Sequence, residues 1–142
     1  MRAVIRSERG EAAALEMMFV IGFLLLPTLV GLAQIPLWID ARSTGELAAQ
    51  EAARQVALAT DFDAGVASAD AIARQIVVNH GWGEDAYRGL SVTGSNTPGA
   101  SVTASVTVEV PAIVVPMVGE VGGGFSRTWS HTEVVDAYRE DP

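Results

Sequence analysis

The sequence predicts an α+β domain carried on a single membrane-spanning helix, with one or two further helices packed on a small antiparallel sheet. Three patterns indicate this architecture. First, Met17 to Trp38 is an apolar segment of 22 residues without a formal charge. Second, residues 43–80 place small and apolar side chains at helical spacing, and third, residues 101–110 alternate between polar and apolar side chains. Helices followed by strands that pair in an antiparallel meander form an α+β domain.

The apolar segment has the length of a membrane helix. At 1.5 Å per residue it spans about 33 Å, which is enough to cross a hydrocarbon core about 30 Å thick. Pro27 and Pro36 each remove a helical hydrogen bond, so we expect a kink or a loosened turn near each of them. Trp38 stands at the far end, where an indole can lie among lipid headgroups. The residues that we expect in the membrane segment include Met17, Phe19, Phe23, Pro27 and Trp38.

Charge is distributed unevenly along the chain, and this predicts the orientation of the helix. Residues 1–10 hold three arginines and one glutamate, whereas 14 acidic residues face 6 arginines from Asp40 onward; the whole chain carries −8. The positive-inside rule therefore predicts a cytoplasmic leader (1–10), a transmembrane helix (11–38) and an extracytoplasmic domain (39–142) in the cytoplasmic membrane. Because an acidic domain repels phosphate backbones, we expect no direct binding of nucleic acid.

A cleaved secretory signal is the alternative interpretation of the apolar segment. Gly31 to Ala33, Gly-Leu-Ala, offers small residues at the two positions that a signal peptidase reads. The apolar run is longer than a usual signal core, and Glu16 interrupts the approach to it. These two features favour a retained anchor.

Glu16 stands directly before the apolar segment. An acidic side chain costs about 2.5–3.5 kcal/mol at the centre of a bilayer and less near the interface. Its carboxylate could lie among the headgroups, or it could pair with a cation from another chain, such as the ammonium at a neighbour's amino terminus. The residues alone leave both interpretations open.

The sequence RGEAAALEMMFVIGFLLLP (residues 9–27) resembles the class III signal sequences of type IV pilins and pseudopilins. In that pattern a short basic leader ends in Gly and is followed by small residues, a Glu and an apolar helix. Residues 47–60 and 101–140 resemble the Ala- and Arg-rich helix and the closing strands of TadE-like minor pilins of tight-adherence (Flp-type, type IVb-like) pilus systems, actinobacterial type. The resemblance covers nearly the whole chain and implies a pilin-like fold.

The resemblance also implies how the amino terminus is processed. A prepilin peptidase would cut after Gly10, Glu11 would become the new amino terminus, and Glu16 would fix the axial register between subunits. Glu16 lies six residues beyond Gly10, whereas the family pattern has five. A cut after Glu11 would restore the spacing without the Gly, and an uncut membrane anchor is the other alternative.

Two helices are expected between the membrane segment and the sheet. Ser43 and Glu46 have the spacing of a capping box, so a helix could restart at Ser43, and Gly45 weakens a simple continuation. The family would have one long helix here, whereas this sequence permits a bend. A second helix is expected over about 68–80, after a turn-rich stretch, and Gly81 ends it. The apolar stripe of the first helix is Ala48, Ala52, Val56 and Ala59.

The strand pattern is strongest at residues 101–110, where strict period two predicts one buried face and one wet face. Leu90 and Val92 indicate a shorter strand before it, and residues 125–135 indicate a partner strand after it. One face of that partner is predicted to carry Ser126, Thr128, Ser130 and Thr132. Residues 111–124 are too apolar for an ordinary surface loop. We expect part of them to extend the strand and part to form a contact surface, although their hydrophobicity favours burial in the core of the domain over such a surface.

No pattern in the sequence predicts catalysis. The chain has no cysteine, and its two histidines, His80 and His131, lie outside any HExxH motif. Gly122 to Gly124 is followed by Phe125, so this run reads as a turn and not as a phosphate-binding loop. We therefore expect neither an enzyme nor a bound cofactor or metal.

Two functions remain. The first is a minor pilin or pilus-assembly (pseudopilin) protein that assembles by helix packing in the membrane and enters a surface pilus after processing. Its implied partners are the lipid bilayer, the major pilin, other minor pilins, a prepilin peptidase and the assembly platform in the membrane. The second is a single-pass, membrane-anchored extracytoplasmic binding module that is not part of a fibre.

Overall fold

The computed structural model describes residues 4–115 and 117–138, with side chains from Glu11 onward. The chain forms two long helical segments joined by a π-helical turn, then a third helix, a 3₁₀ turn and three strands. In chain order these are α1 (Val4–Val20), η1 (Ile21–Leu25), α2 (Leu26–Leu58), α3 (Phe62–Asn79), η2 (Glu84–Ala86), β1 (Tyr87–Gly94), β2 (Ser101–Val115) and β3 (Gly119–Val134). The predicted α+β class is confirmed.

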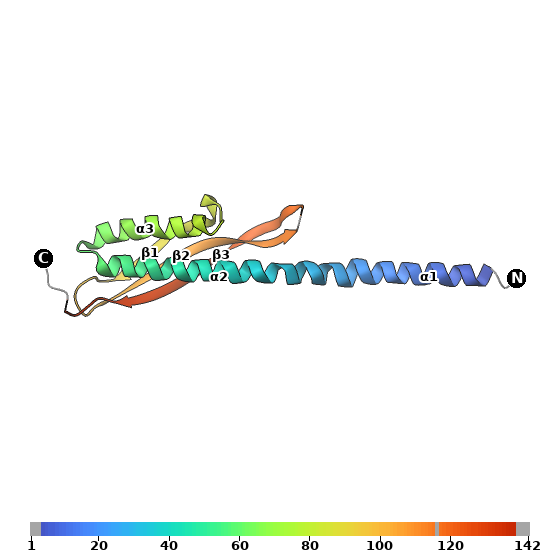
Figure 1. Ribbon diagram of the computed structural model, residues 1–142, viewed down its shortest axis with the longest axis horizontal. Coiled ribbons are helices and arrows are strands. Elements are labelled where there is room, and N and C mark those ends of the chain that lie inside the picture. The colour runs from blue at the N-terminus through green and yellow to red at the C-terminus, as the bar shows by residue number, and fades with distance from the viewer. Residues whose placement is uncertain (1–3, 116, 139–142) are drawn as a thin grey trace.

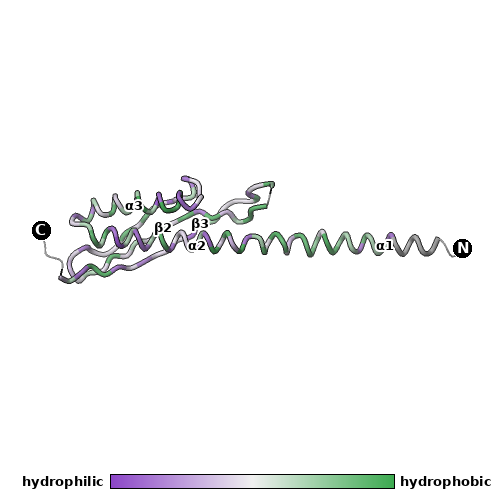
Figure 2. The backbone as a smooth tube through the Cα atoms, in the orientation of Figure 1, coloured by the Kyte–Doolittle hydropathy of each residue, from purple (hydrophilic) through white to green (hydrophobic). Residues whose placement is uncertain are grey.

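The molecule consists of a helical rod and a head (Figure 1). The rod is α1, η1 and the first part of α2, and it projects from the head with the amino terminus at its far end. Figure 2 shows that the projecting part is mostly hydrophobic, whereas polar and apolar residues alternate in the head. In the head, α2 and α3 lie against one face of the sheet and share a single core with it.

The two prolines of the rod differ in their effect on the helix. The π-helical turn Ile21–Leu25 ends two residues before Pro27, so the loosened turn expected near this proline is present. Within this region the hydroxyl of Thr28 donates a hydrogen bond of 2.6 Å to the Leu24 carbonyl. Pro36, in contrast, lies inside α2, which continues as an α-helix on both sides of it. The expected disturbance is therefore found at the first proline only.

The expectation that a helix could restart at Ser43 is wrong, because α2 runs without a break from Leu26 to Leu58. Gly45 does not interrupt the helix. A Cβ added to Gly45 would overlap the six-membered ring of Trp129 on β3, so the glycine permits close contact between the helix and the sheet. Ala59, the last residue of the expected stripe, lies beyond the end of α2 and has extended backbone angles.

Helix α3 begins six residues before the expected start at Ser68. The Asp61 side chain caps it, accepting a hydrogen bond of 2.7 Å from the Ala64 N–H. An aspartate cap satisfies a backbone donor that would otherwise lack a partner at the helix start. Most of the Asp- and Gly-containing stretch that we interpreted as turn-rich therefore forms the first turns of the helix. Its end at Asn79, before Gly81, agrees with the sequence prediction.

The sheet has the order β1-β2-β3, and both strand pairs are antiparallel. The alternation over residues 101–110 is confirmed, since the apolar side chains of this part of β2 face the helices and are buried. Alanines on α2 and α3 let both helices approach that face closely. The core residues of these elements are Ala41, Ala48, Ala49, Ala52, Ala53, Val56, Ala57, Ala69, Ala73, Val77, Val102, Ala104, Val106, Val108 and Val110.

The opposite face of the sheet carries rows of hydroxyl groups. Three cross-strand pairs join β2 to β3, with oxygen–oxygen distances of 2.8, 2.8 and 2.9 Å: Thr103–Thr132, Ser105–Ser130 and Thr107–Thr128. This confirms the predicted polar face of β3. Facing hydroxyls of this kind stabilise the strand register.

The apolar stretch 111–124 forms the end of the β2–β3 hairpin. Strand pairing continues to Val115 and Gly119, with a bulge between Pro111 and Ile113 opposite Gly122. Gly122 has φ +85°, which glycine adopts without strain. The stretch extends the strands, as expected. The favoured burial in the core of the domain is wrong, because the apolar side chains at the end of the hairpin are exposed. Figure 1 shows the end of the hairpin beside α2, directed along the rod towards the amino terminus.

Candidate assembly and membrane-contact surface

The rod leaves its apolar side chains exposed. Among the predicted membrane residues, Met17 and Phe19 are each 64% exposed, Phe23 is 75% exposed and Trp38 is 45% exposed. Pro27 is exposed as well. The rings of Phe19 and Phe23 stack on each other with centroids 4.7 Å apart. An apolar surface of this extent is not stable in water without a cover, so the rod requires lipid or other helices around it.

The structure contains one helix, within Glu11–Leu58, that is long and apolar enough to cross a membrane. Glu16 lies on α1 at the amino-terminal edge of the apolar part, and its side chain is exposed. In the part of the chain that the structure describes, no hydrogen bond or ion pair involves Glu16. Its use as a register carboxylate remains a prediction, because that role requires a second chain.

The predicted processing site lies on the same helix as Glu16. Gly10 and Glu11 are both within α1, one to two helical turns before Glu16. At 100° per residue, Glu11 projects about 140° around the helix from Glu16, so the two carboxylates lie on different faces of the rod. The position of the cut stays a prediction.

Gln34 is a site residue that our reading of the sequence missed. It lies in the uncharged apolar segment, yet it is only 2% exposed. Its side-chain amide donates to the Val114 carbonyl at 2.9 Å, and its side-chain oxygen accepts from the Val114 N–H at 2.8 Å. The same amide nitrogen also donates to the Val30 carbonyl at 2.9 Å.

The Gln34–Val114 pair attaches the hairpin to the rod. β1 pairs with β2 only as far as Val108, so one edge of β2 is left without a neighbouring strand near its end. The Gln34 amide binds this free edge as a neighbouring strand would, through one donor and one acceptor. The sequence did contain a signal for this contact. Gln34 is a lone amide in an apolar segment, and a polar group there requires a partner.

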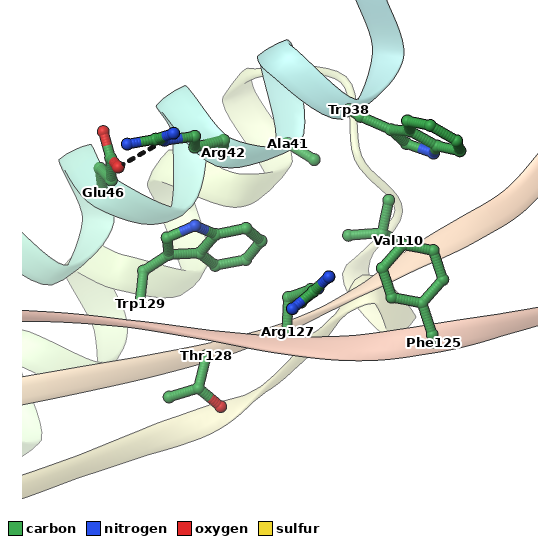
Figure 3. A pocket seen from close by; sticks show the side chains of 9 residues that line it. All are labelled: Trp38, Ala41, Arg42, Glu46, Val110, Phe125, Arg127, Thr128 and Trp129. Carbon is green, nitrogen blue, oxygen red and sulfur yellow. Dashed lines mark hydrogen bonds and ion pairs between the residues drawn. The ribbon is translucent and has the colours of Figure 1, made fainter. Parts of the chain in front are cut away.

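An open cleft of about 640 Å³ lies between α2 and the hairpin, close to Trp38. Figure 3 shows Trp38 and Phe125 on one side and Trp129 on the other, with Arg127 between them. The Arg127 guanidinium lies 5.5 Å from the centre of the Phe125 ring, a cation–π distance. Arg42, at the rim, forms an ion pair of 2.8 Å with Glu46. The cleft thus combines aromatic walls with a cationic group.

A second polar contact stabilises the head away from this cleft. The Tyr87 hydroxyl donates a hydrogen bond of 2.6 Å to the Asp70 carboxylate, and the Arg74 guanidinium lies over the Tyr87 ring. Burial, reinforced by Asp70, raises the pKa of the Tyr87 phenol. This group joins α3 to β1 and has a structural role.

The features above define the architecture: a long apolar amino-terminal helix whose second half packs, with a second helix, on a three-stranded antiparallel sheet. The architecture is pilin-like. No protein-family model matches the chain, and comparison with curated proteins and with solved structures gives no significant match. The pilin-like description therefore depends on the arrangement of the elements.

The two histidines of this pilin-like chain lie on different elements and are far apart in sequence. His80 caps the end of α3, and its ring nitrogen lies 2.9 Å from the Ile76 carbonyl. His131 lies on β3, 3.4 Å from the Glu133 carboxylate. Within residues 4–115 and 117–138, no three histidine or acidic side chains are grouped as metal ligands would be.

Proposed function

We propose that the chain is a minor pilin, or a pilus-assembly (pseudopilin) protein, of a tight-adherence pilus system. The rod is held in the cytoplasmic membrane, with its amino terminus inside and the head outside. Assembly proceeds by packing of the rod against the rods of the major pilin and of other minor pilins. The protein has no catalytic activity of its own.

The observation that carries this proposal is the continuity of the apolar rod with the head. One helix, α2, belongs to both parts, because its second half is buried against the sheet while its first half is exposed and apolar. A subunit built in this way transmits the position of its rod to its head without an intervening linker. A fibre that is held together by its rods then displays the heads at fixed positions.

Glu16 supplies the register in this proposal. A carboxylate at the edge of an apolar surface is stabilised when a neighbouring chain brings a cation to it, and the pair is strongest where little water is present. The ammonium at the amino terminus of a processed neighbour is such a cation. A prepilin peptidase exposes it by cutting after Gly10 or after Glu11, and the membrane assembly platform brings the subunits together.

The mature amino terminus tests the proposal. Sequencing of the protein from its native membrane is expected to give Glu11 or Ala12 as the first residue. A start at Met1 would favour the alternative function, a membrane-anchored binding module outside any fibre. A start at Gln34 would contradict both functions, because the rod would then have been removed as a secretory signal.

A variant tests the role of Glu16 separately. Glu16→Leu is expected to keep membrane insertion and the folded head but to abolish incorporation into fibres, measured by immunoblot of sheared pili. Glu46→Leu is the matched control, because it removes a glutamate of the continuous helical stretch beyond the apolar segment, in the part of α2 that belongs to the head. Normal incorporation of the Glu16→Leu protein would reduce Glu16 to an interfacial side chain without a role in register.

A further inference from the structure

We infer that the end of the β2–β3 hairpin, residues 113–115 and 117–121, inserts into the lipid leaflet nearest the head and forms a second membrane contact beside the rod. The inference rests on the proposed membrane position of the rod. The partner of this hairpin surface is the acyl chains of the lipid.

The end of the hairpin is apolar and exposed. Met117 is fully exposed at 106%, Val118 is 73% exposed, and Val121 and Ile113 are 46% and 41% exposed. Met117 adopts φ +69° in the turn, where a glycine would be unstrained. The turn therefore presents a large apolar side chain at the position where glycine is the easier choice.

The depth of this end follows from the Gln34–Val114 pair. Gln34 lies four residues from Trp38 on α2, about 6 Å closer to the bilayer centre if Trp38 lies at the headgroups. The turn lies one to three strand residues beyond Val114, at roughly 3.3 Å per residue along the rod. The turn, with Met117 and Val118, then lies about 9–16 Å below the level of Trp38, which is among the acyl chains of the leaflet.

Backbone groups at this depth need partners, because lipid offers none. The N–H and the carbonyl of Val114, which point away from β3, are bound by the side chain of Gln34. The turn closes with a hydrogen bond of 3.1 Å from the Val118 N–H to the Val115 carbonyl. Pairing of Val115 with Gly119 and of Ile113 with Val121 joins the two strands up to the turn.

The charged groups nearest to the hairpin end suit an interface. Glu120 pairs with Val114 across the hairpin, yet its side chain borders a polar cleft that also includes Arg88 and Glu109. Arg127 and Phe125 lie four or more residues back along β3, beside Trp38. Apart from Glu120, which borders that polar cleft, the surface changes from aliphatic to aromatic to cationic from the turn towards the head, the order of a leaflet from acyl chains to phosphate.

Site-directed spin labelling tests the inference directly. The chain has no cysteine, so a single introduced cysteine gives one label per molecule. The full-length variants Met117→Cys, Phe23→Cys and Pro98→Cys are labelled with a nitroxide in phosphatidylcholine–phosphatidylglycerol vesicles. Accessibility to oxygen, which concentrates in lipid, is compared with accessibility to a water-soluble nickel chelate. Pro98 is exposed in the turn region between β1 and β2, at the other end of the sheet.

The expected result is a several-fold higher oxygen-to-nickel ratio at residue 117 than at residue 98, approaching the ratio at residue 23. A lipid-like ratio at 23 with a water-like ratio at 117 would overturn the hairpin contact and leave the membrane rod intact. Shielding of residue 117 from both reagents would also overturn it, because the occupant would then be protein. A water-like ratio at residue 23 would overturn the rod itself, and with it both the proposed function and this inference.

Discussion

Gly45 of α2 lies directly against the indole ring of Trp129 on β3, with no room between them for a Cβ. This contact sets the distance between the helix that is shared by rod and head and the outermost paired strand of the sheet. It also explains why a residue of poor helix propensity stands in the middle of a 33-residue helix.

Gly45→Ala is expected to destabilise the head by about 1–3 kcal/mol, because the added methyl group forces the indole or the helix to move. Urea unfolding of the detergent-solubilised protein, followed by near-ultraviolet circular dichroism, measures the change. The control is Gly31→Ala, in the same helix, where an added Cβ meets no atom within 4 Å. It should be neutral or stabilising by up to about 1 kcal/mol; equal effects of the two substitutions would contradict the contact.

Gln34→Leu is expected to release the end of the hairpin from the rod. The N–H and the carbonyl of Val114 would lose their partners on α2, at a cost of about 1–3 kcal/mol. Hydrogen exchange of the Val114 amide, measured on the protein in detergent micelles, should accelerate. Gln50→Leu is the matched control, since Gln50 lies on the same helix with an exposed side chain. Unchanged exchange at Val114 in the Gln34 variant would show that the hairpin is held by other contacts.

The raised pKa of Tyr87 predicts a loss of stability at alkaline pH. The phenol titrates near pH 10 in the unfolded chain, whereas it keeps its proton to higher pH in the folded protein. The contribution of Tyr87 to the free energy of unfolding is therefore complete below about pH 10 and declines as the pH rises above it. Tyr87 and Tyr138 are the two tyrosines of the chain. In a Tyr138→Phe background, absorbance at 295 nm therefore reports Tyr87 alone.

The titration midpoint of Tyr87 should lie above about 10. Asp70→Asn should lower that midpoint, because it removes the carboxylate that accepts the phenol proton. Tyr87→Phe should remove this contribution to the pH dependence of unfolding above about pH 10. If Asp70→Asn did not change the titration midpoint of Tyr87, the whole rise of its pKa would have to come from burial.

The hydroxyl pair Ser105–Ser130 is expected to couple β2 to β3 by about 0.2–1 kcal/mol. A double-mutant cycle of Ser105→Ala and Ser130→Ala, measured by urea unfolding, isolates this energy. The control cycle combines Ser130→Ala with Ser91→Ala, because Ser91 lies on β1 and β2 separates it from Ser130. Equal coupling in the two cycles would exclude a specific hydroxyl contact.

Local periodicity allowed much of the fold to be predicted from the sequence. The uncharged segment 17–38 predicted the apolar rod, and the alternation over 101–110 predicted both faces of β2, because each pattern repeats along a single element. The unusual hydrophobicity of 111–124 correctly indicated that the stretch extends the strand, but the burial in the core that it also favoured is wrong, because the end of the hairpin is exposed. Asp61 as a helix cap could also have been identified, but its neighbours were interpreted as a turn.

Tertiary structure alone decided the contacts that build the candidate site. Gln34 and Val114 are 80 residues apart in the sequence, and Gly45 and Trp129, which are also in contact, come from the first and the last element of the head. Nothing in the residues near Gly45 distinguishes a helix break from a close approach, since both favour glycine. The sequence determined that an apolar rod is joined to an α+β head. Packing determined that the helix α2 belongs to both parts and that the β2–β3 hairpin lies alongside this helix. Periodicity is a property of one segment, whereas contact depends on which distant segment the folded backbone brings within reach.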